Sequence, residues 1–100
     1  MKAIFISYNQ ALTDRINHML DDNGVRGFTR WALTEGRGTH NGEPHYGTHA
    51  WPSMNTSVLA IVEDEKIPVL LDALREIDSL TEQQGSRAFV WDITAIKKKK

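Results

Sequence analysis

Three of the four histidines lie within ten residues of one another, at His40, His45 and His49. Imidazole is the commonest metal ligand in proteins, and the nearby Glu35 and Glu43 could add carboxylate oxygens. The spacing matches no strong zinc pattern, because the surrounding prolines and glycines disfavour the helix that would align two of the rings. The three histidines are therefore candidate ligands for a divalent metal ion. The alternative is that they are exposed loop residues, or hydrogen-bond partners at a subunit contact.

The tripeptide Gly36-Arg37-Gly38 precedes the histidines and has the composition of an anion site. Glycines let backbone amides approach an anion closely, and an arginine between them can pair bidentately with a phosphate or a carboxylate. The alternative is a flexible shoulder of the loop, because Gly-x-Gly alone is weak evidence. Three further cations fall near the ends of expected strands, where a cleft could form or where each could be an exposed ion-pair partner: Arg26, Arg30 and Arg87.

Both features fall in one segment, residues 34–52, which holds four of the seven glycines and two of the three prolines. Glycine loses entropy on ordering and proline removes a hydrogen-bond donor, so this composition predicts a long loop rather than a helix or a central strand. A long loop inside a small domain is commonly functional. Tyr46 and Trp51 are not typical of a disordered linker. We therefore expect the loop to carry the function.

The bulk properties restrict the class of protein. The 100 residues suffice for one domain, taken as residues 1–96 and followed by a solvated lysine tail at 97–100. A net charge of −1 argues against a nucleic-acid partner, and the absence of cysteine excludes disulfides and thiolate metal sites. The apolar run near Met1 is too short for a signal peptide or a membrane span, so we expect a cytoplasmic protein.

The first half of the chain predicts a strand, a helix and a second strand. Residues 2–8 are short, β-branched and aromatic, which is typical of a buried strand. Asn9 is suited to cap the helix that follows, and Gly24 to end it. Residues 25–33 then alternate between apolar and polar side chains, which predicts a strand. Gly27 within this strand indicates a bulge or a close backbone approach.

The second half predicts the same pattern after the loop. Residues 55–63 are apolar on both faces and predict a central strand. Asp64 is expected to cap a second helix, with Pro68 in its first turn and an apolar stripe facing inward. Residues 87–94 form the last expected strand. The order β-α-β-β-α-β predicts an α+β, ferredoxin-like fold, in which a four-stranded antiparallel sheet carries both helices on one face. The free sheet face is apolar, so we expect self-association to cover it.

This order, the large loop between strands two and three, and Gly27-Phe28-Thr29 followed by Gly36-Arg37-Gly38 resemble the PII and PII-like signalling family over nearly the whole chain. In that family the patterns are Gly-Met-Thr and Gly-Phe-Gly, and the long loop is the T-loop. Phrases such as Gly42-Glu-Pro-His45 and Phe89-Val-Trp-Asp92 look like a divergent PII-like branch. Members of that branch tend to be encoded beside heavy-metal efflux or other metal transporters.

The resemblance implies a homotrimer that binds a small effector, often an adenine nucleotide, in clefts between its subunits. It also implies that the loop regulates a membrane transporter, which could be one that carries heavy metals. The turn at residues 82–87 lacks the Gly-Asp-Gly-Lys stretch of PII, with Arg87 as the candidate replacement for its lysine. The effector would be an adenine nucleotide, another anion or a divalent metal ion. The implied cleft residues are Gly27, Thr29, Gly36, Arg37 and Gly38 of one subunit, with Arg87 from a strand edge.

Two other functions remain open at the level of sequence. The first is a metal-binding protein of the related CutA kind, in which His40, His45 and His49 hold the ion. The second is a small ferredoxin-like enzyme, such as a cofactor-free monooxygenase, acting on an aromatic substrate. No Ser/His/Asp arrangement can be argued from the spacing, so we expect no enzymatic activity and assign no catalytic residue.

Overall fold

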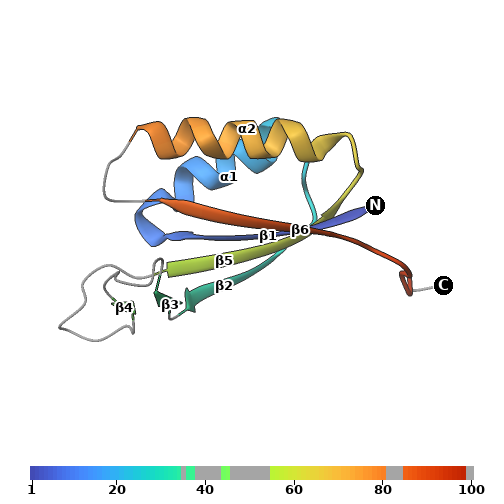
Figure 1. Cartoon of the computed structure of the whole chain (residues 1–100), viewed down its shortest axis with the longest axis horizontal. Helices are drawn as coiled ribbons and strands as arrows, with labels where there is room; N and C mark the ends of the chain where they lie inside the picture. The colour runs from blue at the N-terminus through green and yellow to red at the C-terminus, as the bar shows by residue number, and fades with distance from the viewer. Residues whose placement is uncertain (35, 38–43, 46–54, 81–84, 99–100) are drawn as a thin grey trace.

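A computed structural model describes residues 1–34, 36–37, 44–45, 55–80 and 85–98. The main elements follow the order β1-α1-β2-β5-α2-β6, with two short strands, β3 and β4, between β2 and β5. Figure 1 shows both helices on the same face of the sheet. The predicted α+β ferredoxin-like fold is therefore confirmed. Within the part of the chain that is described, no helix is long and apolar enough to cross a membrane.

The first strand and helix form as their sequence predicts. β1 spans Lys2–Asn9, a 3-10 turn η1 spans Gln10–Leu12, and α1 spans Thr13–Asp22. The side chain of Asn9 accepts a hydrogen bond of 2.9 Å from the amide of Ala11, so its capping role is confirmed on the 3-10 turn that leads into α1. Gly24 then adopts a positive φ of 72°, which ends the helix at little steric cost.

The second strand is shorter than predicted. β2 spans Thr29–Thr34, and residues 25–28 do not pair with the sheet. The reason lies at the end of the preceding helix, because the amide of Val25 donates to the carbonyl of Leu20 at 2.8 Å. Val25 is thus still part of the helix terminus, and its side chain is buried in the core rather than on a strand. The apolar character that suggested a strand serves core packing instead.

The second half contains β5 at Asn55–Val62, α2 at Lys66–Ser79 and β6 at Ser86–Asp92. The predicted cap at Asp64 is wrong, because Glu65 occupies the N-cap of α2 and no side chain caps this helix. The carboxylate of Asp64 instead pairs with the ammonium group of Met1 at 3.0 Å. This contact lowers the pKa of Asp64 below its ordinary value. Pro68 lies in the first turn of α2, as predicted.

The four long strands are ordered β2-β5-β1-β6, and each neighbouring pair is antiparallel. β5 is therefore central, as predicted, and β2 and β6 are the two edges. Ile4 pairs with Ala60 on one side and Val90 on the other, while Phe5 pairs with Leu59 and Phe89. Because paired residues share a face, this register separates a helix-facing set from a set on the free face.

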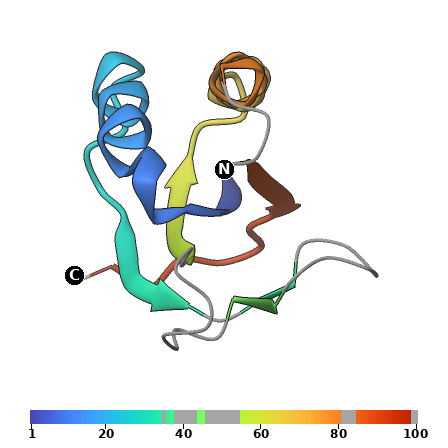
Figure 2. The ribbon, with the colours of Figure 1, turned by 90° about the vertical axis from the view of Figure 1, so that its left-hand side faces the viewer.

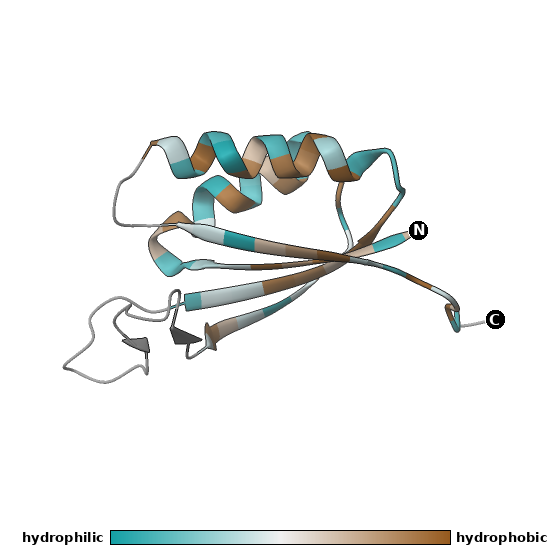
Figure 3. Cartoon of the chain, in the orientation of Figure 1, coloured by the Kyte–Doolittle hydropathy of each residue, from teal (hydrophilic) through white to brown (hydrophobic). Residues whose placement is uncertain are grey.

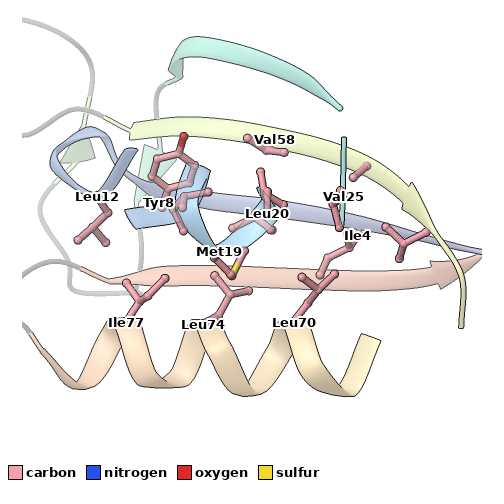
Figure 4. Packing of buried hydrophobic residues seen from close by; sticks show 14 residues of the cluster. Ile4, Tyr8, Leu12, Met19, Leu20, Val25, Val58, Leu70, Leu74 and Ile77 are labelled. Carbon is pink, nitrogen blue, oxygen red and sulfur yellow. The ribbon is translucent and has the colours of Figure 1, made fainter. Parts of the chain in front are cut away.

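The core lies between the sheet and the helices. Figure 2 shows the two helices side by side over one face of the sheet, and Figure 4 shows α2 directing Leu70, Leu74 and Ile77 toward the strands. They pack against buried side chains such as Ile4 and Leu20. This confirms the predicted inward stripe of α2, in which residues recur at helical spacing.

The free face of the sheet is apolar and exposed. Figure 3 shows hydrophobic residues along the middle of the long strands. Trp31 is 44% exposed, Phe89 56% and Trp91 48%, which is unusual for residues of this size. Phe5 and Trp31 contact one another with ring centroids 6.4 Å apart. Such a contiguous apolar face is typical of a surface that another chain covers.

Candidate functional site at the loop end of the sheet

The β3–β4 segment and Arg87 lie at or near one end of the sheet, where Asn55 pairs with both Asn9 and Thr34, and Ser86 pairs with Tyr8. We call this the loop end. β2 finishes here and β5 and β6 begin here, and Figure 1 shows β3 and β4 beyond the same end. The segment that holds the histidines and the stretch that leads into β6 are thus attached to the same end of the molecule.

The segment predicted as an irregular loop contains a short antiparallel ladder. β3 is Gly36–Arg37 and β4 is Pro44–His45, with Gly36 opposite His45 and Arg37 opposite Pro44. This ladder is a separate two-stranded sheet, and a single residue lies between the end of β2 at Thr34 and its first residue, Gly36. The backbone therefore brings a candidate anion-binding residue, Arg37, and a candidate metal ligand, His45, into one hairpin.

Thr29 lies in the middle of the β2 edge, and Gly27 precedes the strand, so both are farther from the loop end than Thr34 is. Gly27 precedes β2, so the predicted bulge at this residue is wrong. A Cβ at Gly27 would meet nothing within 4 Å, and no close approach by the described protein atoms explains the glycine. Thr29 is exposed and pairs with Leu59, which places it on the free face of the sheet.

Arg87 lies on the opposite edge of the same sheet. It pairs with Ser7, which pairs with Ser57, which in turn pairs with Trp31 on β2. Three strand spacings of about 4.8 Å separate β6 from β2, so Arg87 and Thr29 are at least roughly 14 Å apart at the backbone. A single chain does not bring the predicted cleft residues together. The β2 edge of one chain and the β6 edge of another could do so.

The real bulge lies further along β2. Trp31 pairs with Ser57 and Thr34 with Asn55, so two residues of β2 face the single residue Thr56 of β5. The hydroxyl of Thr56, which is 3% exposed, donates to the carbonyl of Ala32 at 2.8 Å. Thr34 and Ser57 share a second hydrogen bond of 3.3 Å. Our sequence reasoning missed these residues, although the two adjacent hydroxyl side chains of Thr56 and Ser57 in a largely apolar central strand are the signal that could have found them.

The β6 edge is fixed by a different contact. The carboxylate of Asp78, near the end of α2, accepts hydrogen bonds from the amide and the hydroxyl of Ser86, each at 2.9 Å. The amide of Asn9 also donates to the carbonyl of Gly85 at 3.4 Å. These bonds tie the start of β6, directly before Arg87, to α2 and to β1.

Arg30, one of the predicted cleft cations, has a different partner set. Its Nε donates to the hydroxyl of Tyr8 at 3.1 Å, and its guanidinium also donates to the side chain of Asn17 on α1. The guanidinium carbon lies 4.8 Å from the centre of the Phe28 ring. Arg30 therefore joins β2 to the helix layer. Of the other predicted cations, Arg26 is exposed between α1 and β2.

Several predicted residues lie wholly or partly outside the described structure. Gly38, His40 and His49 are not among the described residues, and for His45, Gly36 and Arg37 only the backbone is described. Among the residues that are described, no group of three or more His, Cys, Asp or Glu side chains could hold a metal ion. The histidine cluster remains a prediction.

The opposite end of the sheet carries an ion pair. Lys2 on β1 donates to the carboxylate of Asp92 on β6, its direct partner in the register. This hydrogen bond raises the pKa of Lys2 above its ordinary value. The contact ties the β6 edge to β1 at that end, as the Asp78 contact with Ser86 secures the start of β6 at the loop end.

Several solved structures of known proteins are similar to this one. The chain is similar in structure to CPII from Thiomonas intermedia K12 bound to ADP and bicarbonate, with a TM-score of 0.75 and 24% identity over 92% of this chain and 84% of that one. A second structure of CPII, bound to ADP, AMP and acetate, gives a TM-score of 0.75 at 22% identity over 96% and 88% of the two chains. A PII-like signalling protein from Thermus thermophilus gives 0.64 at 22% over 90% and 83%.

These solved structures support the fold. No curated protein sequence matches the chain. The family model for nitrogen regulatory protein P-II, however, matches residues 1–100. A match of that extent settles the family, and with it the non-enzymatic, signalling character that distinguishes its members from the ferredoxin-like enzymes. The chain belongs to the P-II family of signalling proteins.

Proposed function

We propose that this protein is a trimeric signalling protein of the cytoplasm that binds an adenine nucleotide in clefts between subunits. The observation that carries this proposal is the separation of the candidate residues. Thr29 and the start of the β3–β4 hairpin lie on the β2 edge, whereas Arg87 lies on the β6 edge. A site that uses both edges needs two chains, and a ring of three chains would repeat it three times.

The free face of the sheet supports the assembly. Its exposed aromatic side chains, with Phe89 and Trp91 on β6 and Trp31 on β2, would be buried if the sheets of neighbouring subunits packed together. Burial of apolar area contributes about 25 cal/mol per Å². A domain of 100 residues has a modest core of its own, so burial of this face would also stabilise the subunit.

Adenine nucleotides are the first ligands to test. One CPII structure holds ADP and bicarbonate, and another holds ADP, AMP and acetate. In this chain the backbone of Gly36 and the guanidinium of Arg37 are suited to a phosphate, as is Arg87 from the facing edge. Gly38 would extend the first group, and Gly27 and Thr29 would line the wall along β2.

We propose that the segment 34–52 transmits the signal to a membrane transporter. The hairpin begins directly after β2 at the loop end, so a ligand held by Gly36 and Arg37 would select among arrangements of the segment that continues from them. The three histidines fit a transporter of metal ions, or direct binding of a divalent ion by the segment itself. This last possibility stays a prediction.

The proposal is tested by native mass spectrometry of the protein with ADP, AMP, ATP or zinc. We expect a trimer that takes up one adenine nucleotide per subunit. Replacing Arg37 with alanine should weaken nucleotide binding by about 1.5–3 kcal/mol, because a charge-assisted pair to phosphate is lost. Arg75→Ala is the matched control, since Arg75 is exposed on α2 and pairs with Asp72. Unchanged affinity in Arg37→Ala would remove this residue from the site, and a monomer that binds no nucleotide would refute the proposal.

A further inference from the structure

The chain leaves β2 directly after a bulge opposite Thr56. At a bulge, two residues of one strand oppose a single residue of its partner, so the regular ladder of backbone hydrogen bonds is interrupted. Here the two residues lie between Trp31 and Thr34. Ala32 is one of these two residues, and its carbonyl needs a hydrogen-bond partner because a polar group without one is costly in a sheet.

Thr56 supplies that partner through its side chain. It is the residue of β5 that directly faces the bulge, it is 3% exposed, and its hydroxyl donates to the carbonyl of Ala32 at 2.8 Å. The neighbouring hydroxyl pair, Thr34 with Ser57, lies one step away at 3.3 Å. Valine is nearly isosteric with threonine and is favoured in strands, so the strand itself does not require a hydroxyl at this position.

The bulge is followed at once by a change of sheet. Thr34 is the last residue of β2, and Gly36 already belongs to the separate β3–β4 ladder. Bulges bend a strand and alter its twist, so the conformation at Ala32 and Leu33 sets the direction in which the chain leaves for Gly36 and Arg37.

We propose that Thr56 is a positioning residue for the effector site, because its hydroxyl holds the bulge that aims Gly36 and Arg37. The expected effect of Thr56 on ligand binding rests on the proposed nucleotide function. Its effect on the bulge does not depend on that function. This role does not require Thr56 to touch the effector. It acts through the backbone of Ala32, so its effect on the position of Gly36 and Arg37 is the same whichever anion is bound.

The test uses Thr56→Val, which removes the hydroxyl at almost constant volume, and Thr56→Ser, which keeps it. In the full-length protein we expect Thr56→Val to raise the Kd for ADP about tenfold and to speed amide hydrogen exchange in residues 29–34 by a similar factor. Thr56→Ser should restore both quantities to within about twofold of the original protein.

A general loss of stability is separated from loss of positioning by Val62→Ala. Val62 is buried in the same strand at the opposite end of the sheet, and its truncation leaves the bulge untouched. An equal loss of ADP affinity in Val62→Ala would overturn the proposal, as would unchanged exchange in residues 29–34 of Thr56→Val. Faster exchange with unaltered ADP affinity would overturn the role in binding. If the unsubstituted protein binds no ADP, the nucleotide function fails, and the exchange data still decide whether Thr56 holds the bulge.

Discussion

At the scale of single residues, partners rather than charge decide what each polar side chain does. The sequence suggests Arg30 as a cation at a cleft or an exposed ion-pair partner, yet it donates to Tyr8 and Asn17. Asp64 looked like a helix cap, yet it pairs with the ammonium of Met1. Sequence spacing predicted Asn9 and Gly24 correctly because their roles depend on neighbours a few residues away. It failed for Arg30 and Asp64 because their partners come from distant parts of the chain.

The contact between Arg30 and Tyr8 leads to a prediction about stability. Tyr8 is 1% exposed, so its hydroxyl depends on the bond from Arg30. Arg30→Ala should lower the free energy of unfolding by about 1–3 kcal/mol, because a buried hydroxyl loses a partner. In the double variant Arg30→Ala with Tyr8→Phe, part of this loss should be recovered, since no hydroxyl is left unpaired. Chemical denaturation of Arg30→Ala, Tyr8→Phe and the double variant measures these losses, and strictly additive losses would show that the two residues are not coupled.

At the scale of elements, periodicity predicted the type of each long element but not which residues meet. The stripe containing Leu70, Leu74 and Ile77 identified α2 because helical spacing is a local property. The sequence also predicted an apolar free face of the sheet, and the exposed Phe89 lies on it. It could not predict that Arg87 and Thr29 lie on opposite edges, because strand order depends on pairing between distant segments. The bulge was misplaced at Gly27 for the same reason, since its position depends on the pairing of β2 with another strand, β5.

The free face of the sheet gives a prediction about assembly. Phe89→Lys places a charge within the apolar face, so we expect the trimer to dissociate, because a lysine would have to be desolvated at the contact. Val69→Lys is the control, since Val69 is 52% exposed on α2, a similar exposure to the 56% of Phe89, but on the helix layer. Analytical ultracentrifugation measures both. A Phe89→Lys protein that sediments like the unsubstituted one would place the subunit contact elsewhere.

At the scale of the whole molecule, the proposed function makes the subunit alone an incomplete site. Its two edge strands carry different halves of the candidate cleft, Thr29 with the hairpin on one side and Arg87 on the other. The fold could be predicted from the sequence because it is encoded within one chain. The site could be predicted only as a set of residue types, because its geometry depends on how copies of the chain meet. Effector binding and assembly should therefore be coupled, since each bound ligand bridges two subunits.

The most direct measurement is a complementation experiment between two binding-deficient variants. Subunits with Arg37→Ala and subunits with Arg87→Ala are mixed, unfolded and refolded together, and nucleotide uptake is measured by native mass spectrometry. In a cyclic trimer, every mixed assembly contains one cleft in which both arginines are retained. We predict that mixed trimers bind one ADP with the affinity of the unsubstituted protein, while neither variant alone does so. If mixed trimers bind no better than the single variants, the site does not span two subunits and the account is wrong.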